Sequence, residues 1–255
     1  MCKDCGCGDA NHAHGHRHVD TEGREYWHTH EHDQEHEHGR TIVVEKDVLS
    51  RNDAIARDNR QWLDARRITA FNLMSSPGAG KTALLEKTLA MLPHGLHPAV
   101  LVGDQETDLD ARRLRAAGER VKQINTYSSC HLDAAMIARE LGTFVDEHAN
   151  LLLIENVGNL VCPASFDLGE HVRVAVLSVT EGEDKPVKYP VLFSSADAVV
   201  ITKTDLIPHL DWNREQCHAC IRKSGSRARI IELSARTGEG MDAWIRYLQA
   251  MMRHE

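Results

Sequence analysis

A short segment rich in glycine and hydroxyl side chains carries the clearest chemistry in this sequence. It reads Ser75-Ser76-Pro77-Gly78-Ala79-Gly80-Lys81-Thr82, follows an apolar run and precedes a helical pattern. The glycines would let backbone N–H groups wrap an anion, at the positive end of the helix dipole. Lys81 would reach the β- and γ-phosphates of a nucleotide, and the Thr82 hydroxyl would ligate Mg²⁺. Although Ser75 stands where the usual motif has its first glycine, the segment predicts a phosphate loop that contacts nucleotide through Gly78, Ala79, Gly80, Lys81, Thr82 and Ala83.

Two further segments predict which base is bound. Thr202-Lys203-Thr204-Asp205 follows an apolar run and resembles the guanine signature N-K-x-D, with Thr202 in place of asparagine. The Asp205 carboxylate can accept hydrogen bonds from N1–H and the 2-amino group of guanine, which adenine does not offer. The Lys203 stem can cover the base, and Ser234-Ala235 resembles the loop that supports the guanine O6 edge. We therefore predict GTP and GDP, rather than ATP, as ligands.

Acidic residues end two other apolar runs. Asp104 and Glu155 stand where a carboxylate can hold Mg²⁺, directly or through water, and Gly158 follows in a variant of the switch motif D-x-x-G. The simpler alternative is that either residue only caps the following helix. We predict Lys81, Thr82, Asp104 and Glu155 as the catalytic group. Because no residue stands out as a water-positioning group, we expect slow hydrolysis.

Cysteine and histidine are concentrated near the N-terminus. Cys2, Cys5 and Cys7 could bind Ni²⁺ in a square plane or Zn²⁺ in a tetrahedron, together with the amine freed by removal of Met1. A histidine tract follows, interleaved with acidic residues; it is either a metal buffer or a solvated spacer. It contains His12, His14, His16, His18, His28, His30, His32, His36 and His38.

A third metal candidate lies inside the nucleotide-binding part of the chain. Cys130-His131 and Cys162 follow runs that we expect to end at the same edge of the sheet. On spacing alone this is a weak indication, because buried cysteines usually only pack. We expect the same structural role for Cys217-His218-Ala219-Cys220, which a helix would carry.

Apolar runs alternate with amphipathic stretches after residue 67, which predicts an α/β fold with a mostly parallel, seven-stranded sheet covered by helices on both faces. Strands are predicted at 68–74, 99–103, 121–125, 151–155, 172–179, 198–202 and 229–233, and helices at 81–92, 109–116, 132–148, 211–222 and 241–252. Residues 1–40 form a Cys/His-rich tail without enough apolar surface to fold, residues 41–67 a helical segment started by Ser50 or Asn52, and residues 68–255 the GTPase domain.

Composition excludes several function classes. The net charge of −8 gives no support for nucleic-acid binding. No apolar run approaches the roughly 18 residues of a membrane span, and the N-terminus lacks a signal-peptide core, so we expect a cytoplasmic protein without a membrane partner. Seven cysteines, an odd number, argue against a disulfide framework and leave metal binding open.

With these motifs in view, the sequence resembles the HypB family, GTPases of the SIMIBI class of phosphate-loop proteins that assist nickel insertion into [NiFe] hydrogenases. The most specific stretch runs from Glu155 to Glu170 and reads ENVGNLVCPASFDLGE, and Ser75 fits the family's own loop, S-S-P-G-x-G-K-T. The resemblance implies a high-affinity nickel site at Cys2, Cys5 and Cys7, and a nickel or zinc site at Cys130, His131 and Cys162. Tyr127 departs from the glycine expected before the Cys-His pair.

The resemblance also implies partners. These are a second copy of the chain, in a dimer linked to GTP and metal, a second nickel-binding maturation protein of the HypA type, and the precursor of the hydrogenase large subunit. Two alternatives remain open at this point: a nickel-storage protein in which nucleotide turnover is incidental, and a urease-type nickel-insertion GTPase. The stretch from Asn159 to Glu170 speaks against the urease type.

Overall fold

The computed structural model of the protein describes residues 15–19, 25–29, 35–104, 109–115, 120–127 and 129–252. The chain divides into two compact units, Met1–Val48 and Leu49–Glu255. In the first unit, β1 (Gly15–Val19) pairs antiparallel with β2 (Glu25–Thr29). Helix α1 (Glu35–Asp64) runs from the first unit into the second. Only the backbone is described before residue 47.

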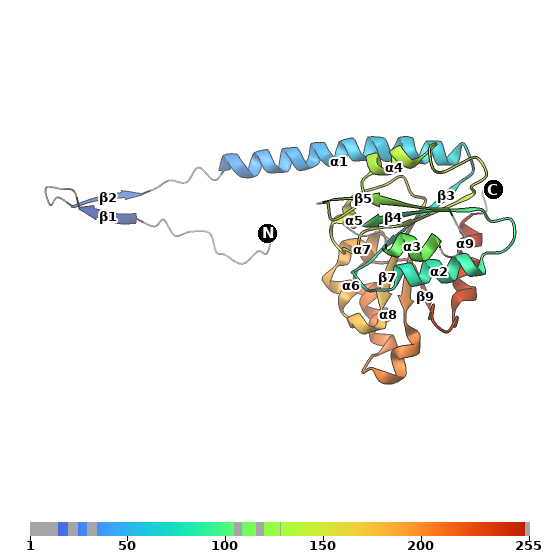
Figure 1. The fold of residues 1–255 in the computed structure, drawn as a ribbon. Helices are drawn as coiled ribbons and strands as arrows, with labels where there is room; N and C mark the ends of the chain where they lie inside the picture. The colour runs from blue at the N-terminus through green and yellow to red at the C-terminus, as the bar shows by residue number, and fades with distance from the viewer. Residues whose placement is uncertain are drawn as a thin grey trace. The chain divides into compact units, whose positions relative to one another are not determined.

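The second unit is built on a seven-stranded sheet in the order β5-β4-β6-β3-β7-β8-β9 (Figure 1). All neighbouring strands are parallel, as predicted. Most of these strands are apolar and buried on both faces, which is the pattern of a sheet covered on two sides. The strands are β3 (Thr69–Met74), β4 (Pro98–Asp104), β5 (Arg120–Asn125), β6 (Leu151–Glu155), β7 (Val172–Ser178), β8 (Ala198–Thr202) and β9 (Arg229–Glu232).

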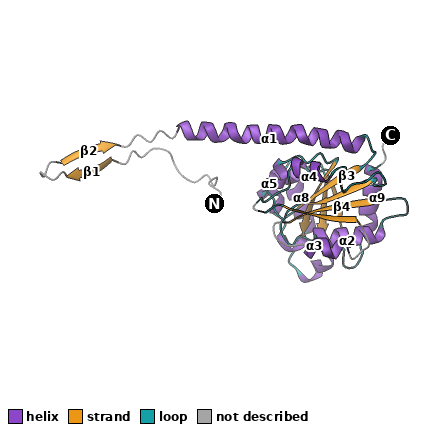
Figure 2. Cartoon of the chain, turned by 45° about the horizontal axis from the view of Figure 1, so that its top comes forward, coloured by secondary structure: helices purple, strands orange, loops and turns teal. Residues whose placement is uncertain are grey.

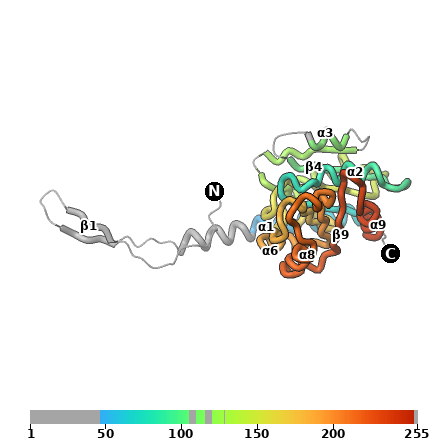
Figure 3. The backbone as a smooth tube through the Cα atoms, turned by 90° about the horizontal axis from the view of Figure 1, so that it is seen from below, coloured from blue at the N-terminus to red at the C-terminus, as the bar shows by residue number. Residues whose placement is uncertain are grey.

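Helices cover both faces of this sheet (Figure 2). Phe71 and Leu73 of β3 pack in one cluster with α2 (Lys81–Met91), α3 (Leu109–Arg115) and α9 (Met241–Met251). Figure 3 shows α9 beside α2, where Trp244 Nε1 donates to Thr88 Oγ1 at 2.9 Å. Ala70 of β3 faces the opposite side, where α1 and α4 (Ala134–Glu140) pack. Further along that side lie α7 (Pro190–Ser195) and α8 (Arg214–Lys223).

Three details differ from the sequence prediction. The helix expected over 132–148 is the shorter α4, because the chain turns at Gly142, whose φ of 80° is left-handed. Ser50 and Asn52 do not start a helix; α1 passes through both, and the buried Asn52 side chain bonds to other segments. The short helices were not predicted, since they are too brief to show a period: α5 (Cys162–Ser165), α6 (Lys185–Lys188), α7, η1 (Val179–Glu181) and η2 (Thr204–His209).

Within the described part of the chain, no helix combines the length and the apolar character needed to cross a membrane.

Candidate nucleotide and metal sites

The predicted phosphate loop connects β3 to α2, so it leaves the sheet at the carboxyl end of a central strand. Gly78 and Gly80 have φ values of 74° and 98°, a left-handed conformation that other residues adopt only with strain. They turn the backbone back over the start of α2, which begins at Lys81. The buried Lys81 amine donates to Ser75 Oγ at 2.8 Å. Ser75, which replaces the first glycine of the usual motif, therefore anchors the lysine.

A cavity of about 460 Å³ opens over this loop. Lys81, Thr82, Asp104 and Glu155, the predicted catalytic group, all line it, together with Gly78, Gly80, Ala83 and Gly158. A Cβ added at Gly158 would lie 3.0 Å from Pro77 Cα. The loop after β6 therefore approaches the phosphate loop as closely as a glycine allows. One cavity thus joins the phosphate loop to the ends of β4 and β6.

Glu155 is a buried carboxylate at the base of this cavity. The Thr82 hydroxyl donates to Glu155 Oε1 at 2.7 Å. Burial raises the pKa of Glu155 to about 7, although the Lys81 charge and the Thr82 hydrogen bond act in the opposite direction. The other oxygen, Oε2, is buried and has no hydrogen-bond partner among the described residues. A buried carboxylate oxygen without a donor fits a site for a divalent cation.

A second cavity of about 260 Å³ adjoins the first and shares Gly80 and Ala83 with it. It is lined by the residues predicted to recognise guanine: Thr202, Lys203, Asp205, Ser234 and Ala235. Ser234 Oγ donates to Asp205 Oδ1 at 2.6 Å, which fixes the carboxylate. Phosphate groups in the first cavity and a base in the second could belong to one bound nucleotide.

Thr202 and Lys203 connect these two cavities. The buried Thr202 hydroxyl donates to the Ala79 carbonyl at 2.6 Å, and Lys203 Nζ donates to the Gly78 carbonyl at 2.7 Å. Thr202 thus ties the base-binding loop to the phosphate loop. Although threonine replaces asparagine at position 202, the Asp205 carboxylate still lines the base cavity.

Cys130, His131 and Cys162 come together, although 32 positions separate the two cysteines. The sulfurs lie 2.9 Å apart, and His131 Nδ1 lies 3.8 Å from Cys130 Sγ. One ligand atom from each residue lies within 4.8 Å of the others. That spread suits a single ion with bonds of about 2.0–2.3 Å to nitrogen and sulfur. Among the described residues, this is the one cluster of three or more such side chains that could hold a metal.

The environment of His131 favours a ligand role. Its ring stacks on Phe166, with the ring centroids 3.9 Å apart. Burial lowers the pKa of His131, against the opposing charge of Asp133. A neutral imidazole keeps the lone pair that a metal ion requires. The ring is therefore oriented and kept unprotonated at neutral pH.

Asn156 links the metal cluster to the phosphate cavity, and we did not predict it as a site residue. It follows Glu155 and is buried. Its Oδ1 accepts from the backbone N–H of Leu132, the neighbour of His131, at 3.2 Å. Its Nδ2 donates to Asn72 Oδ1 of β3 at 3.2 Å. The only signal in the sequence is an uncharged polar residue directly after the strand, between Glu155 and Val157.

Asp110 and Arg113 of α3 also line the phosphate cavity and were not predicted. Arg113 Nη2 pairs with Glu86 at 2.7 Å, and its Nη1 lies 3.7 Å from Asp110. In addition, Ser76 of the phosphate loop donates to Glu181, whose other oxygen accepts from the Ser178 N–H at 2.9 Å. The spacing of charged residues on a helix does not distinguish cavity residues such as Asp110 and Arg113 from ordinary surface charges.

The remaining metal candidates form no second cluster within the part of the chain whose side chains are described. Cys2, Cys5, Cys7 and the side chains of the histidine tract lie outside the described residues. Cys217 is buried in the core, and burial raises the pKa of its thiol to about 12. His218 Nε2 lies 2.8 Å from Glu232 Oε1. The structural role expected for this group agrees with that packing.

Comparison with known proteins identifies the family to which the chain is similar. The family model for the CobW/HypB/UreG nucleotide-binding domain matches residues 69–232. The hydrogenase maturation factor HypB of Azotobacter vinelandii is 50% identical over 210 residues, which cover 82% of this chain and 69% of the relative. The crystal structure of HypB from Archaeoglobus fulgidus is 39% identical and superposes with a TM-score of 0.75, covering 80% of this chain and 100% of that chain.

A second solved structure, HypB from Helicobacter pylori in complex with nickel, is 35% identical with a TM-score of 0.74 and covers 80% of this chain and 95% of that one. The chain belongs to the HypB family of hydrogenase maturation factors, which are GTPases.

Proposed function

We propose that this GTPase uses its nucleotide state to control the binding and release of nickel at Cys130, His131 and Cys162 during maturation of a [NiFe] hydrogenase. The observation that carries the proposal is the segment from Glu155 to Cys162. It lines the phosphate cavity at Glu155 and Gly158 and ends at a sulfur 2.9 Å from Cys130 Sγ. Any movement of this segment on GTP hydrolysis would reach the metal cluster within a few residues.

Mg²⁺ is the cofactor that the phosphate cavity fits. Thr82, Asp104 and Glu155 would hold it, and the unpartnered Glu155 Oε2 supports this assignment. When bound, Mg²⁺ would neutralise charge on the β- and γ-phosphates. Lys81 and the backbone N–H groups of the phosphate loop would orient the same phosphates, and Asp205 would accept from guanine N1–H and the 2-amino group.

Nickel is the cargo that the metal cluster fits best, and zinc is its closest competitor. Two thiolates and an imidazole are borderline-soft donors that accept either ion. The Helicobacter pylori relative was solved with nickel, which favours nickel as the ion carried. The tail residues Cys2, Cys5 and Cys7 would supply further nickel to the GTPase domain.

We propose three partners for this activity: a second copy of the chain, a nickel-binding maturation protein of the HypA type, and the hydrogenase large-subunit precursor. Val161, whose side chain is 60% exposed, and Tyr127, 78% exposed, flank the metal cluster. Exposed apolar and aromatic side chains beside a half-buried metal site suit contact with a protein surface. A storage role does not require this coupling between nucleotide and metal.

Replacement of Cys162 by Ala tests the proposal. We expect it to remove one bound nickel per chain and to abolish nucleotide-linked dimerisation, measured by metal analysis and light scattering with GDP and with a non-hydrolysable GTP analogue. Cys220→Ala is the matched control, because Cys220 is also a partly exposed cysteine but lies outside the cluster. If metal content and dimerisation both survive in Cys162→Ala, the coupling is wrong.

Lys81→Ala tests the nucleotide half of the proposal separately. The buried amine is the only lysine in the described lining of the phosphate cavity, so its loss removes the main positive charge that faces the phosphates. We expect GTP turnover to fall by at least about 100-fold, in line with the loss of one preorganised charged donor. Unchanged turnover, measured as phosphate release, would end the assignment of this cavity to GTP hydrolysis.

A further inference from the structure

Two separate segments carry the metal cluster, and each must be held in place for the ligand atoms to meet. The first, which we call arm 1, runs from Cys130 to Ala134, where α4 begins. The second, arm 2, runs from Cys162 to Glu170 and contains α5. Neither arm is a strand of the sheet, so sheet hydrogen bonds do not fix their separation.

Asn52 of α1 bonds to both arms at once. Its Oδ1 accepts from the Ala134 N–H of arm 1 at 2.9 Å, and its Nδ2 donates to the Asp167 carbonyl of arm 2 at 2.8 Å. The side chain is 6% exposed. A buried amide that bridges two backbone segments fixes their distance, because loss of either bond leaves a buried polar group unsatisfied.

Asn59, two helical turns further along α1, makes the same kind of bridge. Its Nδ2 donates to the Ala134 carbonyl of arm 1 at 2.8 Å and to the Leu168 carbonyl of arm 2 at 3.0 Å. A Cβ added at Gly169 would lie 2.6 Å from the Ala56 carbonyl oxygen and 2.6 Å from Asn59 Cβ. Arm 2 is therefore pressed against α1 as closely as its backbone permits.

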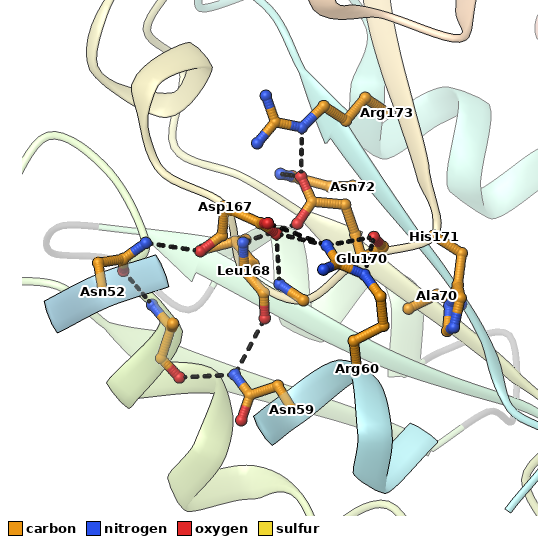
Figure 4. Close-up of polar contacts among 12 residues, drawn as sticks. Asn52, Asn59, Arg60, Ala70, Asn72, Asp167, Leu168, Glu170, His171 and Arg173 are labelled. Atoms are coloured by element: carbon orange, nitrogen blue, oxygen red, sulfur yellow. Dashed lines mark hydrogen bonds and ion pairs between the residues drawn. The ribbon is translucent and has the colours of Figure 1, made fainter. Parts of the chain in front are cut away.

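Charged side chains also hold arm 2 (Figure 4). Arg60 of α1 binds the Asp167 carboxylate through Nη2 at 2.8 Å. The buried Glu170 accepts from Arg173 Nε at 2.9 Å and from Asn72 Nδ2 at 3.2 Å. Figure 4 shows Asn52, Asn59 and Arg60 reaching from α1 toward Asp167 and Leu168. Helix α1 thus bonds directly to both arms through its side chains, at Ala134 of arm 1 and at Asp167 and Leu168 of arm 2.

We propose that Asn52 and Asn59 are positioning residues of the Cys130–His131–Cys162 site, and that α1 thereby sets its metal affinity. This inference rests on the proposed metal-binding function of that site. Outer residues that orient ligands commonly change metal affinity by about 10- to 100-fold. Because α1 begins within the Cys/His-rich tail, at Glu35, a partner that shifts α1 would loosen the site from outside the nucleotide cavity.

The first test measures metal affinity in the full-length chain with Cys2, Cys5 and Cys7 replaced by Ser, so that tail thiolates do not contribute. Co²⁺ is the probe, because thiolate-to-Co²⁺ charge-transfer absorbance reports sulfur ligation directly. We expect Asn52→Ala and Asn59→Ala each to weaken Co²⁺ binding by about 10- to 100-fold and to reduce the charge-transfer band. Binding of GDP should stay within about twofold of the parent, because neither asparagine lines a nucleotide cavity.

The second test needs no metal. The same proteins are equilibrated with reduced and oxidised glutathione, which supply the electrons and the oxidant for one disulfide, and the fraction of the Cys130–Cys162 disulfide is measured by mass spectrometry. The equilibrium depends on how closely the arms hold the two sulfurs. We expect both asparagine variants to disfavour this disulfide by at least about tenfold. This measurement tests the positioning role of Asn52 and Asn59 separately from the proposed metal binding. The expected result is the same even if the parent protein binds no metal at the cluster.

Two controls guard against a general loss of stability. Asn150→Ala removes an asparagine that also bridges two backbone groups, the His97 N–H at 2.9 Å and the Gly95 carbonyl at 2.8 Å, away from the arms. Leu63→Ala removes a fully buried α1 side chain that packs in the same cluster as Leu132 and Leu168 but makes no hydrogen bond to either arm. The proposal is overturned if Asn52→Ala and Asn59→Ala leave both readouts unchanged. It is equally overturned if Leu63→Ala lowers Co²⁺ affinity and the disulfide fraction as much as the asparagine variants do, at a similar loss of stability.

Discussion

At the scale of single residues, the two ionisable groups buried under the phosphate cavity explain its preference for a nucleotide with a divalent cation. Burial lowers the pKa of Lys81 and raises that of Glu155, and each charge partly stabilises the other. A phosphate near Lys81 and a cation near Glu155 would offset both desolvation costs. Binding of a phosphate and a divalent cation would therefore relieve an electrostatic strain between these two buried groups.

The buried Glu155 carboxylate predicts that the free energy of unfolding depends on pH. The pKa of Glu155 is raised from 4.5 to about 7 in the folded chain, so the folded state holds this proton more tightly than the unfolded state. Its contribution to stability is fully present below pH 4.5 and is lost as the pH rises through 7. Glu155→Gln, which cannot ionise, should therefore be more stable than the parent at pH 8 by up to about 3 kcal/mol, without Mg²⁺ or nucleotide.

Urea unfolding at two pH values checks this expectation. The gain in free energy of unfolding for Glu155→Gln should shrink below about 1 kcal/mol at pH 5, because Glu155 is then largely protonated in the folded state. A gain that is the same at pH 5 and pH 8, or a parent that becomes relatively more stable at high pH, would contradict the raised pKa.

Asp205 provides a test of base recognition at the same scale. Its carboxylate, fixed by Ser234, can accept from both donors of the guanine edge, whereas an asparagine would place an N–H group against one of them. Asp205→Asn should lower GDP affinity by at least about 100-fold and raise affinity for xanthosine diphosphate, whose 2-position carries an acceptor. Calorimetry with both nucleotides checks this; GDP affinity within twofold of the parent would refute the assignment.

At the scale of elements, local patterns in the sequence identify the strands and the phosphate loop. The buried strands are continuous apolar runs, and the loop is one contiguous motif, so both could be predicted without tertiary information. Asn52 could not, because its role depends on segments 82 and 115 positions away. Asn156 and Arg113 were missed for the same reason: each contacts its site only after α3, α4 and the sheet have packed.

The close approach of the loop after β6 to the phosphate loop predicts a cost for any side chain at Gly158. A Cβ there would lie 3.0 Å from Pro77 Cα and N, and backbone atoms move less readily than side chains. We expect Gly158→Ala to cost about 1–3 kcal/mol of stability and to weaken binding of a GTP analogue more than binding of GDP. Equal loss for both nucleotides would argue against a γ-phosphate role for this loop.

The turn before the Cys-His pair gives a prediction with a built-in control. Tyr127 has a φ of 51°, the left-handed conformation that the expected glycine would adopt without strain. Relief of about 1 kcal/mol of strain should make Tyr127→Gly at least as stable as the parent, despite the greater flexibility of glycine when unfolded. Tyr127→Ala keeps the strain and should show no gain. Thermal unfolding of the parent, Tyr127→Gly and Tyr127→Ala measures these differences in stability. If Tyr127→Ala is also stabilised, backbone strain at position 127 is not the cause of the gain.

At the scale of the whole GTPase domain, the parallel sheet explains why nucleotide and metal residues meet. Strands β3, β4, β5, β6 and β8 all deliver their next loop to the same edge of the sheet, the usual ligand-binding edge of such folds. The phosphate cavity, the base cavity and the metal cluster follow from that one arrangement. Asn156 and the segment from Glu155 to Cys162 then provide a short route between cavity and cluster.

The most direct test of this coupling is a nickel titration of the full-length chain with Cys2, Cys5 and Cys7 replaced by Ser, once with GDP and once with a non-hydrolysable GTP analogue. Cys162→Ala in the same background identifies the signal of the internal cluster. The account predicts that nickel affinity at this cluster differs by at least about tenfold between the two nucleotide states, a coupling free energy of about 1.4 kcal/mol. Equal affinity in both states would contradict it.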